Sequence, residues 1–358
     1  MRAAELLYDM AGLQAHERSQ LGYRRAAAAI VALAEPVAEL VTAGALRDIP
    51  YVGPASARLL IEFVRDGRMA AMEDAMARSG KAAEVVASRR FREGFLSHHA
   101  MLRALETKLA PAVVSRAAYR GDFQMHSTGS DGAERLGTMA AACIALGHTC
   151  LGITDHSYGL PIARGMSMAS AARQHREADR LNEKYGSGFR IFKGIEANIL
   201  ADGTLDLQPA ERAAFEFVVA SPHSLLRRSE DQTARMVGAV RSTGVAILGH
   251  PRGRMFNKRA GVSADWDAVF EAAAERRVAI ELDGNWHRQD LDYLLARRAL
   301  EAGCIFALDS DAHSTSELRF SEYAIAHARL AGIPATKVIN CWTHDELSEW
   351  MNARPRAQ

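Results

Sequence analysis

The sequence lacks an apolar run long enough to cross a membrane, and it lacks paired cysteines. Its longest apolar stretches, such as residues 26–34, are interrupted by Arg, Glu or Pro before the roughly 18 residues that a membrane-spanning helix needs. Residues 1–10 carry Glu5 and Asp9 where a signal peptide would have its apolar core. The four cysteines show no C-x-x-C spacing, which argues against a disulfide framework or a zinc ribbon. We therefore predict a cytoplasmic protein with buried thiols and no membrane partner.

Extremes of composition and charge are absent as well. The 358 residues are 48% hydrophobic and 24% charged, which excludes disordered, collagen-like and coiled-coil proteins, and the length allows two domains. The net charge of +1 conceals an uneven distribution, because residues 1–120 carry 17 Lys and Arg against 13 Asp and Glu, whereas residues 121–358 carry 27 against 30. The basic front permits contact with phosphate backbones. The acidic remainder, which holds ten of the 13 histidines, is compatible with metal binding.

Several enzyme signatures are missing too. The sequence contains no P-loop, no glycine-rich dinucleotide loop and no Ser-His-Asp order. The classes of NTPase, oxidoreductase and nucleophilic hydrolase therefore find no support.

The sequence pattern of the first 115 or so residues predicts helices and no strands. Up to about residue 115, apolar residues recur with a 3.6-residue spacing in residues 3–13, 23–33, 38–46 and 55–64. Residues 46–57 have the pattern of two helices joined by a tight Pro/Gly turn, which is typical of a helix-hairpin-helix. We predict a small all-α helix-hairpin-helix domain over residues 1–70 and a helical connector over residues 71–120.

From residue 121 the pattern changes to alternating strands and amphipathic helices. Seven β-branched runs predict strands, at residues 121–126, 150–156, 190–199, 215–223, 245–250, 278–285 and 305–313. The intervening helices are expected at residues 133–146, 169–185, 231–243, 265–276, 290–301 and 317–331. Successive βα units indicate a parallel sheet, and seven of them suggest an α/β protein with a closed, TIM-like barrel.

Residues that bind metals lie at the carboxyl ends of six of these strands. They are His126, Asp155 with His156, Glu196, His223, His250, and Asp311 with His313, and Asp131 follows shortly after the first. A single histidine at such a position is more often structural. The joint pattern is informative, because the carboxyl ends of parallel barrel strands meet on one face.

Imidazole and carboxylate together form the usual ligand set for zinc, manganese or iron, and Glu196 can bridge two ions. Two or three ions held close together activate water and stabilise both the entering and leaving oxygens of a phosphate. The pattern therefore predicts phosphoester hydrolysis with two to three divalent ions per chain.

The motifs around these residues resemble those of the PHP (polymerase and histidinol phosphatase) family. The motifs are Gly-Asp-Phe-Gln-Met-His-Ser-Thr-Gly-Ser-Asp-Gly, Thr-Asp-His-Ser, Lys-Gly-Ile-Glu-Ala-Asn-Ile, Ala-Ser-Pro-His-Ser, Leu-Gly-His-Pro and Asp-Ser-Asp-Ala-His-Ser. The resemblance covers residues 121–350 and is strongest to bacterial family X DNA polymerases, whose amino-terminal helix-hairpin-helix domain residues 1–70 also resemble.

This resemblance implies a distorted (β/α)7 barrel with a trinuclear metal site, and activities that include 3′–5′ exonuclease action. The metal ligands that it implies here are His126, Asp131, His156, Glu196, His223, His250, Asp311 and His313. Of these, we expect Glu196, Asp311 and His250 to be catalytic. The residues expected to contact DNA are Val52, Gly53 and Ala55.

The sequence also departs from the family pattern. Gln124 replaces the first His of the usual His-x-His, and its side chain offers only a weak neutral oxygen. The preference of the site therefore shifts from zinc toward a harder ion such as manganese or magnesium. Too few residues separate Arg68 from Gly121 for a polymerase palm, and Leu59 replaces a Schiff-base lysine, so neither polymerase nor lyase activity is expected. Tyr51 replaces a hairpin glycine that lets the backbone approach a phosphate.

Four further residues would face the same end of the barrel as candidate substrate contacts: Arg164, Arg252, Arg254 and Asn285. Three hypotheses remain open. The first is a metal-dependent phosphoesterase that acts on DNA ends, and the second is a small-molecule phosphomonoesterase of the histidinol-phosphatase type. The third is a DNA-binding module with a degenerate metal site. The sequence leaves the oligomeric state open.

Overall fold

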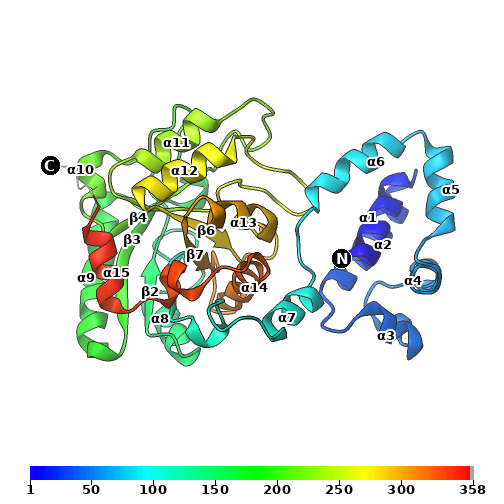
Figure 1. The fold of residues 1–358 in the computed structure, drawn as a ribbon, viewed down its shortest axis with the longest axis horizontal. Coiled ribbons are helices and arrows are strands. Elements are labelled where there is room, and N and C mark those ends of the chain that lie inside the picture. The colour runs from blue at the N-terminus through cyan, green and yellow to red at the C-terminus, as the bar shows by residue number, and fades with distance from the viewer. Residues whose placement is uncertain (355–358) are drawn as a thin grey trace. The chain divides into compact units, whose positions relative to one another are not determined.

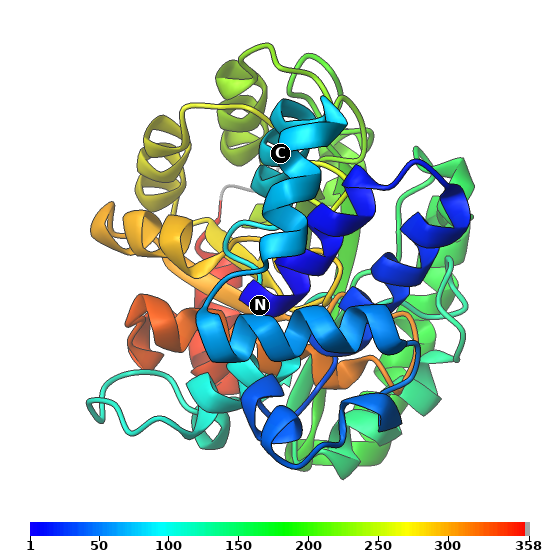
Figure 2. The same ribbon diagram turned by 90° about the vertical axis from the view of Figure 1, so that its right-hand side faces the viewer.

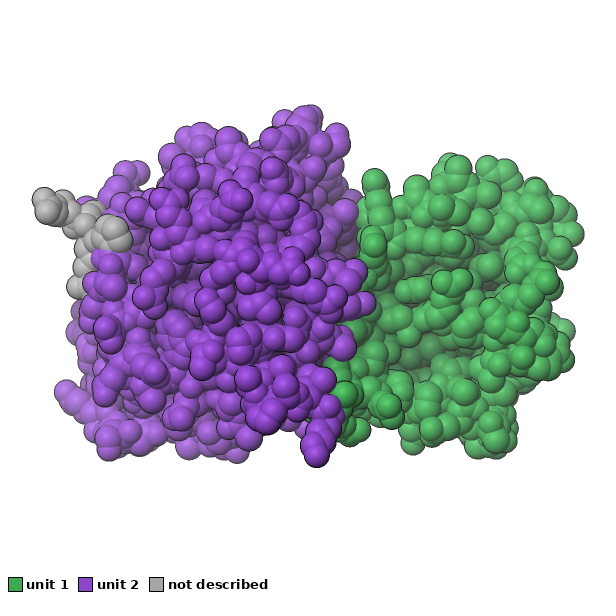
Figure 3. Space-filling view, viewed as in Figure 1, with its two compact units in different colours: residues 1–107, 256–258 green, residues 108–255, 259–358 purple. Residues whose placement is uncertain are grey.

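The chain folds into two compact units. The computed structural model of the protein describes residues 1–354, and Figure 3 distinguishes the units by colour. Unit 1 comprises residues 1–107 and 256–258, and unit 2 comprises residues 108–255 and the chain from residue 259 onward. The predicted connector is thus divided, because residues 71–107 lie in unit 1 and residues 108–120 lie in unit 2.

Unit 1 is built from helices. They are α1 (Arg2–Leu13), α2 (Glu17–Val31), α3 (Val37–Thr42), α4 (Pro54–Asp66), α5 (Ala70–Ser79), α6 (Ala82–Ser88) and α7 (His98–Glu106), with short 3₁₀ turns at Leu46–Asp48 and Arg89–Phe91. Apolar residues three and four apart give each long helix one buried face, and Leu7, Leu60 and Met69 are fully buried where these faces meet.

The turn that precedes α4 contains one unusual residue. Pro54 is the first residue of α4, where its missing N–H costs nothing. Tyr51 adopts φ 66°, a left-handed conformation that glycine adopts without strain, and its ring is exposed beneath the Arg25 guanidinium at 5.4 Å. The backbone before α4 therefore has a glycine-like conformation at residue 51 although a tyrosine occupies it.

Unit 2 contains a sheet of seven parallel strands in sequential order, β1 to β7. They are β1 (Gly121–Asp122), β2 (Cys150–Ile153), β3 (Arg190–Asn198), β4 (Phe217–Ser221), β5 (Val245–Leu248), β6 (Ala279–Asp283) and β7 (Ile305–Asp309). Beyond the two ends of the sheet, Met125 forms a parallel bridge with Ala312, whose carbonyl accepts the His126 N–H at 2.8 Å. The predicted (β/α)7 barrel is confirmed, and its distortion lies where the very short β1 faces β7.

Helices surround these strands, as Figures 1 and 2 show. They are α8 (Leu136–Ala145), α9 (Met168–Tyr185), α10 (Pro209–Arg212), α11 (Thr233–Arg241), α12 (Trp266–Arg276), α13 (Tyr293–Glu301), α14 (Ser321–Ala331) and α15 (His344–Asn352). All seven strands end earlier than predicted, so that every candidate ligand except Glu196 lies on a loop beyond its strand. The short helices α10 and α15 were not predicted.

Aromatic side chains fill the barrel interior below the strand ends. The ring of Phe123 lies 5.8 Å from that of Phe192 and 6.0 Å from that of Phe217. Gly152 and Gly194 make room for Phe217, because a Cβ at either position would lie within 2.6 Å of its ring. These strand glycines are therefore packing residues, and the filled interior leaves the loops as the place for chemistry.

The structure bears on two features of the sequence, its lack of long apolar runs and its four cysteines. Among residues 1–354, no helix combines the length and the apolar character needed to traverse a bilayer. The four cysteines are free thiols, of which Cys143, Cys150 and Cys304 are buried. Burial raises the pKa of Cys150 and of Cys304 to about 12, so these thiols are unreactive packing groups.

Candidate metal centre

The eight predicted metal ligands converge beyond the carboxyl ends of the barrel strands. They come from the loop after β1 (His126, Asp131), the loop after β2 (His156), strand β3 (Glu196), and the loops after β4 (His223), β5 (His250) and β7 (Asp311, His313). Each of the eight has a nitrogen or oxygen within 4.0 Å of another member. The parallel sheet thus gathers residues from widely separated parts of the chain.

Three candidate ligands, all histidines, surround Asp131. Its Oδ1 lies 3.4 Å from His313 Nε2, 3.7 Å from His156 Nε2 and 4.0 Å from His126 Nδ1. One ligand atom from each of these four residues lies within 4.8 Å of all the others. Three imidazoles and a carboxylate at this spacing can surround a single ion.

Glu196 connects this group to a second one. Its Oε2 lies 2.8 Å from His156 Nδ1 and 3.6 Å from His126 Nε2, whereas its Oε1 lies 2.9 Å from His250 Nε2 and 3.5 Å from His223 Nε2. Because the two oxygens of one carboxylate face different imidazoles, Glu196 has the position of a bridging ligand.

Asp311 joins the cluster to a buried cation that the sequence did not reveal. Its Oδ1 lies 3.2 Å from His126 Nε2, and its Oδ2 lies 3.4 Å from Arg288 Nη2. Arg288 also lies 3.8 Å from Asp283 Oδ2. Although burial opposes ionisation of Asp311, the charge of Arg288 holds the pKa of this carboxyl below its usual range. The arginine therefore keeps Asp311 available as an anion.

The donor set fits divalent metal ions. Several buried polar atoms of the cluster have no hydrogen-bond partner in the described chain: His126 Nδ1, both ring nitrogens of His223, and His250 Nδ1. A buried polar atom without a partner costs about 1–3 kcal/mol, and coordination would satisfy these atoms. Imidazole and carboxylate donors suit zinc, manganese or iron.

Two candidate ligands stand on strained backbone. His250 has φ 24° and Asp311 has φ 52°, in the region that L-residues rarely adopt. Such a conformation costs about 1–3 kcal/mol and persists only where the surroundings enforce it. The His250 N–H donates to the buried Glu281 carboxylate, and the Asp311 carbonyl contacts His313 Nδ1 at 2.9 Å. The strained backbone conformation places the His250 and Asp311 side chains in the cluster.

The loop that carries His126 and Asp131 is fixed by Asp155, which the sequence placed among the metal-type residues. The Asp155 carboxylate accepts hydrogen bonds from the backbone N–H groups of Ser127 and Ser130, both at 2.9 Å, and from both hydroxyls at 2.6 Å. Because its oxygens are occupied in this way, Asp155 positions the loop.

The charges of the cluster stabilise one another. Although burial opposes protonation, the hydrogen bond to Asp131 and the charge of Asp311 raise the pKa of His313 to about 10. The same hydrogen bond overcomes burial at Asp131 and lowers the pKa of its carboxyl to about 2. Burial lowers the pKa of His223 to about 3, so this imidazole is neutral and its lone pair is available.

Sequence reasoning missed four buried carboxyl groups beneath the cluster, Asp122, Glu281, Asp283 and Asp309. Burial first, and then neighbouring carboxylates, raise the pKa of each of them. A signal was present in β6, because Glu281 and Asp283 are two residues apart, and such residues point to the same face of a strand. Arg288, by contrast, lies on a loop without any periodic signal.

The four predicted substrate contacts differ in burial and in the partners that they already have. Arg252 and Arg254 pair with Asp292 Oδ2 at 3.1 and 2.9 Å, so both guanidinium groups already have a structural partner. Asn285 donates its N–H to Asp283 at 2.6 Å, and Arg164 is exposed with φ 56°. A role in binding substrate stays a prediction for all four.

The predicted DNA contacts lie at the turn before α4. Val52 is buried, and its N–H already donates to the Ile49 carbonyl at 3.1 Å. Gly53 is the extended residue that immediately precedes α4, and Ala55 is exposed in the first turn of that helix. A contact of Val52 with a phosphate would therefore need a change in this hydrogen bond.

Gln124 is buried, and neither its amide oxygen nor its amide nitrogen has a hydrogen-bond partner in the described chain. We predict that Gln124→His increases the metal retained after gel filtration by up to one equivalent, because imidazole is a better ligand than a neutral amide. Metal content measured by plasma mass spectrometry checks this, with hydrolysis measured in parallel. Unchanged metal content would mean that residue 124 does not face an ion.

Taken together, the fold and the cluster define a (β/α)7 barrel with a group of imidazole and carboxylate side chains, suited to divalent metal ions, at the carboxyl ends of its strands. No family model matches the chain. It is 37% identical over 222 residues to the DNA polymerase/3′-5′ exonuclease PolX of Bacillus subtilis (strain 168), a match that covers 62% of this chain and 39% of PolX. It is 29% identical over 164 residues to a probable phosphatase of Thermoanaerobacter sp. (strain X514), covering 43% of this chain and 64% of the relative.

The chain therefore spans less than two thirds of both of these curated relatives. The probable phosphatase YcdX of Escherichia coli O81 (strain ED1a) is 27% identical over 234 residues, covering 62% of this chain and 90% of that protein. A crystal structure of histidinol phosphate phosphatase from Lactococcus lactis with zinc, L-histidinol and phosphate has 17% identity and a TM-score of 0.44, covering 59% of this chain and 94% of that one. The sequence matches confirm the resemblance to the PHP family and to its family X polymerase members.

Proposed function

We propose that this chain is a metal-dependent phosphoesterase that hydrolyses phosphodiester bonds or terminal phosphates of DNA. The observation that carries the proposal is the cluster of eight imidazole and carboxylate side chains, several of which have buried atoms without a hydrogen-bond partner. The names of the relatives, an exonuclease and several phosphatases, support the reaction class.

Two to three divalent ions, of manganese or zinc and less readily magnesium or iron, would be held by the eight ligand residues described above. Ions in such a site lower the pKa of water and stabilise negative charge on a phosphate. Glu196 and Asp311 supply anionic oxygens, and His250 supplies a nitrogen 2.9 Å from Glu196. Arg288, whose charge faces Asp311, favours an anionic substrate at this edge.

The front of the chain supports DNA as the substrate. Residues 1–120 carry an excess of four positive charges, and the turn before α4 keeps a hairpin-like course. We propose that Gly53 and Ala55, with Val52 beside them, contact DNA phosphates. The helix-hairpin-helix would then bring DNA to the enzyme without contributing to the chemistry.

A small-molecule phosphomonoesterase is the second candidate. It is favoured by the match to YcdX, which extends over 90% of that probable phosphatase, whereas the match to PolX extends over 39% of PolX. A DNA-binding module with a degenerate site is less well supported, because all the predicted ligands except Gln124 are imidazoles or carboxylates in mutual contact.

Metal removal tests the proposal. We expect dialysis against a chelator to abolish hydrolysis of 3′-end-labelled DNA and of p-nitrophenyl phosphate, and added manganese or zinc to restore it, because the site needs its ions to activate water. Gel analysis of the DNA and absorbance of the released nitrophenol measure the two activities. Rates unaffected by the chelator would contradict the proposal. Turnover of phosphorylated metabolites with intact DNA ends would favour the second candidate.

A further inference from the structure

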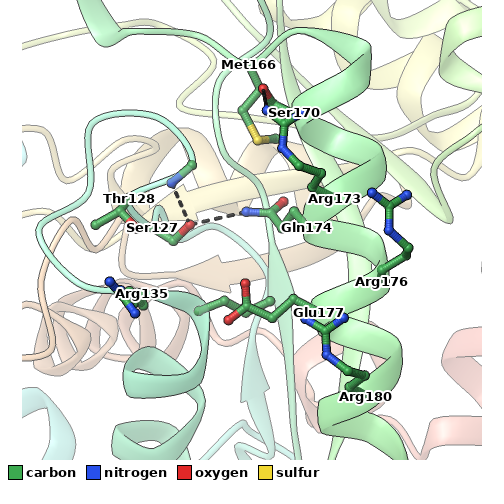
Figure 4. A pocket seen from close by; sticks show the side chains of 12 residues that line it. Ser127, Thr128, Arg135, Met166, Ser170, Arg173, Gln174, Arg176, Glu177 and Arg180 are labelled. Carbon is green, nitrogen blue, oxygen red and sulfur yellow. Dashed lines mark hydrogen bonds between the residues drawn. The ribbon is translucent and has the colours of Figure 1, made fainter.

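A groove of about 680 Å³ lies in unit 2 between α9 and the loop that joins β1 to α8 (Figure 4). It is lined by Ser127, Thr128, Gly129, Arg135, Leu136, Met166, Ser170, Arg173, Gln174, Arg176, Glu177 and Arg180. None of the eight candidate metal ligands is among them. The groove is therefore a feature separate from the ligand cluster.

The groove is strongly basic. Arg173, Arg176 and Arg180 lie on one face of α9 at positions i, i+3 and i+7, and Arg135 stands opposite them at the start of α8. All four arginines are exposed, and within residues 1–354 none of them forms an ion pair, while Glu177 is the one carboxylate in the lining. Their charge is thus available to an anion from outside.

The groove shares a wall with the metal centre. Ser127 and Gly129, which line it, belong to the loop between His126 and Asp131. Ser127 Oγ accepts hydrogen bonds from Gln174 Nε2 at 3.2 Å and from the Gly129 N–H at 3.0 Å (Figure 4), while it donates to Asp155 at 2.6 Å. A Cβ at residue 129 would lie 2.7 Å from Asp155 Oδ2, so only glycine lets the loop come this close.

From this arrangement we infer that the groove binds the sugar-phosphate backbone of a single-stranded nucleic acid whose end reaches the metal centre. The inference rests on the proposed function, because it names the substrate class of that centre. A rise of 1.5 Å per residue separates Arg173 from Arg180 by about 10 Å along α9. One strand of B-form DNA carries about three phosphates over that axial length, whereas a phosphorylated metabolite offers one.

The lining also indicates how the strand is recognised. None of the lining residues is aromatic, so stacking of bases does not contribute, and the contacts are those of guanidinium groups with phosphates. Recognition of this kind is independent of base sequence and sensitive to salt. A single strand with several phosphates is the occupant that matches the row of arginines.

The test uses a triple variant, Arg173→Gln/Arg176→Gln/Arg180→Gln, in the full chain. The matched control, Arg241→Gln/Arg276→Gln/Arg297→Gln, removes the same charge from exposed positions on α11, α12 and α13. Fluorescence anisotropy with a labelled oligothymidylate in a chelator measures binding without cleavage. Hydrolysis of p-nitrophenyl phosphate with manganese measures the chemistry separately.

We expect the groove variant to bind the oligonucleotide at least about tenfold more weakly. The slope of log affinity against log salt should become shallower by about 2, because each lost contact to a single strand removes about 0.7. Glu177→Gln should tighten binding about twofold, since it removes the one negative charge of the lining. The control variant should bind as the unaltered chain does, and p-nitrophenyl phosphate hydrolysis should stay within about twofold in every variant.

Equal affinity and equal salt slopes in both triple variants would overturn the inference, as would no binding by the unaltered chain. Affinity that does not rise between a dinucleotide and longer oligothymidylates, or full displacement by millimolar inorganic phosphate, would also overturn it in favour of a site for a single phosphate. If the arginines support oligonucleotide binding but no phosphoester is hydrolysed, the proposed function fails and the groove remains a nucleic-acid site.

Discussion

Glu196→Gln should reduce phosphoester hydrolysis by at least about a thousandfold, the scale of losses seen when a central catalytic group is removed. Both oxygens of Glu196 face imidazoles, at 2.8 Å from His156 and at 2.9 Å from His250. A neutral amide keeps the shape of the side chain but loses the negative charge and one acceptor oxygen. The variant should therefore also retain at least one metal equivalent fewer, as measured by plasma mass spectrometry.

Glu183→Gln is the matched control, because Glu183 is an exposed residue on α9. It should leave hydrolysis and metal content unchanged. Circular dichroism of both variants establishes that they are folded. If Glu196→Gln hydrolyses DNA and p-nitrophenyl phosphate as fast as the unaltered chain, the cluster is not the catalytic centre.

Arg288→Met should lower kcat/KM about a hundredfold, comparable to the loss of a preorganised charge that stabilises a transition state. Arg288 Nη2 lies 3.4 Å from Asp311 Oδ2, and Arg288 Nε lies 3.8 Å from Asp283 Oδ2. Without it, Asp311 loses the positive charge that holds the pKa of its carboxyl below the usual range, and its ionised form becomes less stable. Arg288→Lys keeps the charge without the planar guanidinium, and we expect a loss of only about tenfold.

Arg354→Met provides a control at the opposite end of the barrel. Arg354 donates to the Val245 carbonyl at 2.9 Å, at the amino end of β5, and to the Arg277 carbonyl at 2.6 Å. Its loss should lower the melting temperature without changing kcat/KM at 20 °C. Activity of Arg288→Met equal to that of the unaltered chain would show that this buried arginine is only structural.

The barrel could be predicted because its pattern is local. Seven β-branched runs separated by amphipathic helices require a parallel sheet, and each run indeed contains a strand. The positions at which the strands end were harder to predict from the sequence. Strand β1 ends at Asp122 and β2 ends at Ile153, where hydrogen bonding to the neighbouring strand stops and a loop begins. Such boundaries depend on the partner strand, which a single segment of sequence does not contain.

The candidate metal ligands could be predicted from the sequence for a related reason. Residues as far apart as His126 and His313 follow equivalent strand ends, so topology alone brings them together. Asp155 shows where this argument fails, since it too follows a strand end but accepts hydrogen bonds from Ser127 and Ser130. Whether a carboxylate coordinates an ion or anchors a loop depends on its neighbours in space.

The sequence by itself determined the class of fold, the helical front and the set of residues available for metals, because periodicity and strand order are encoded along the chain. The tertiary structure alone decided which charges meet. It places Arg288 beside Asp311 and pairs Arg254 with Asp292, and it lines a groove with Arg135 and the arginines of α9. These are pairings of flexible side chains on loops and helix surfaces, and they follow from burial and distance, which no periodic pattern of residues records.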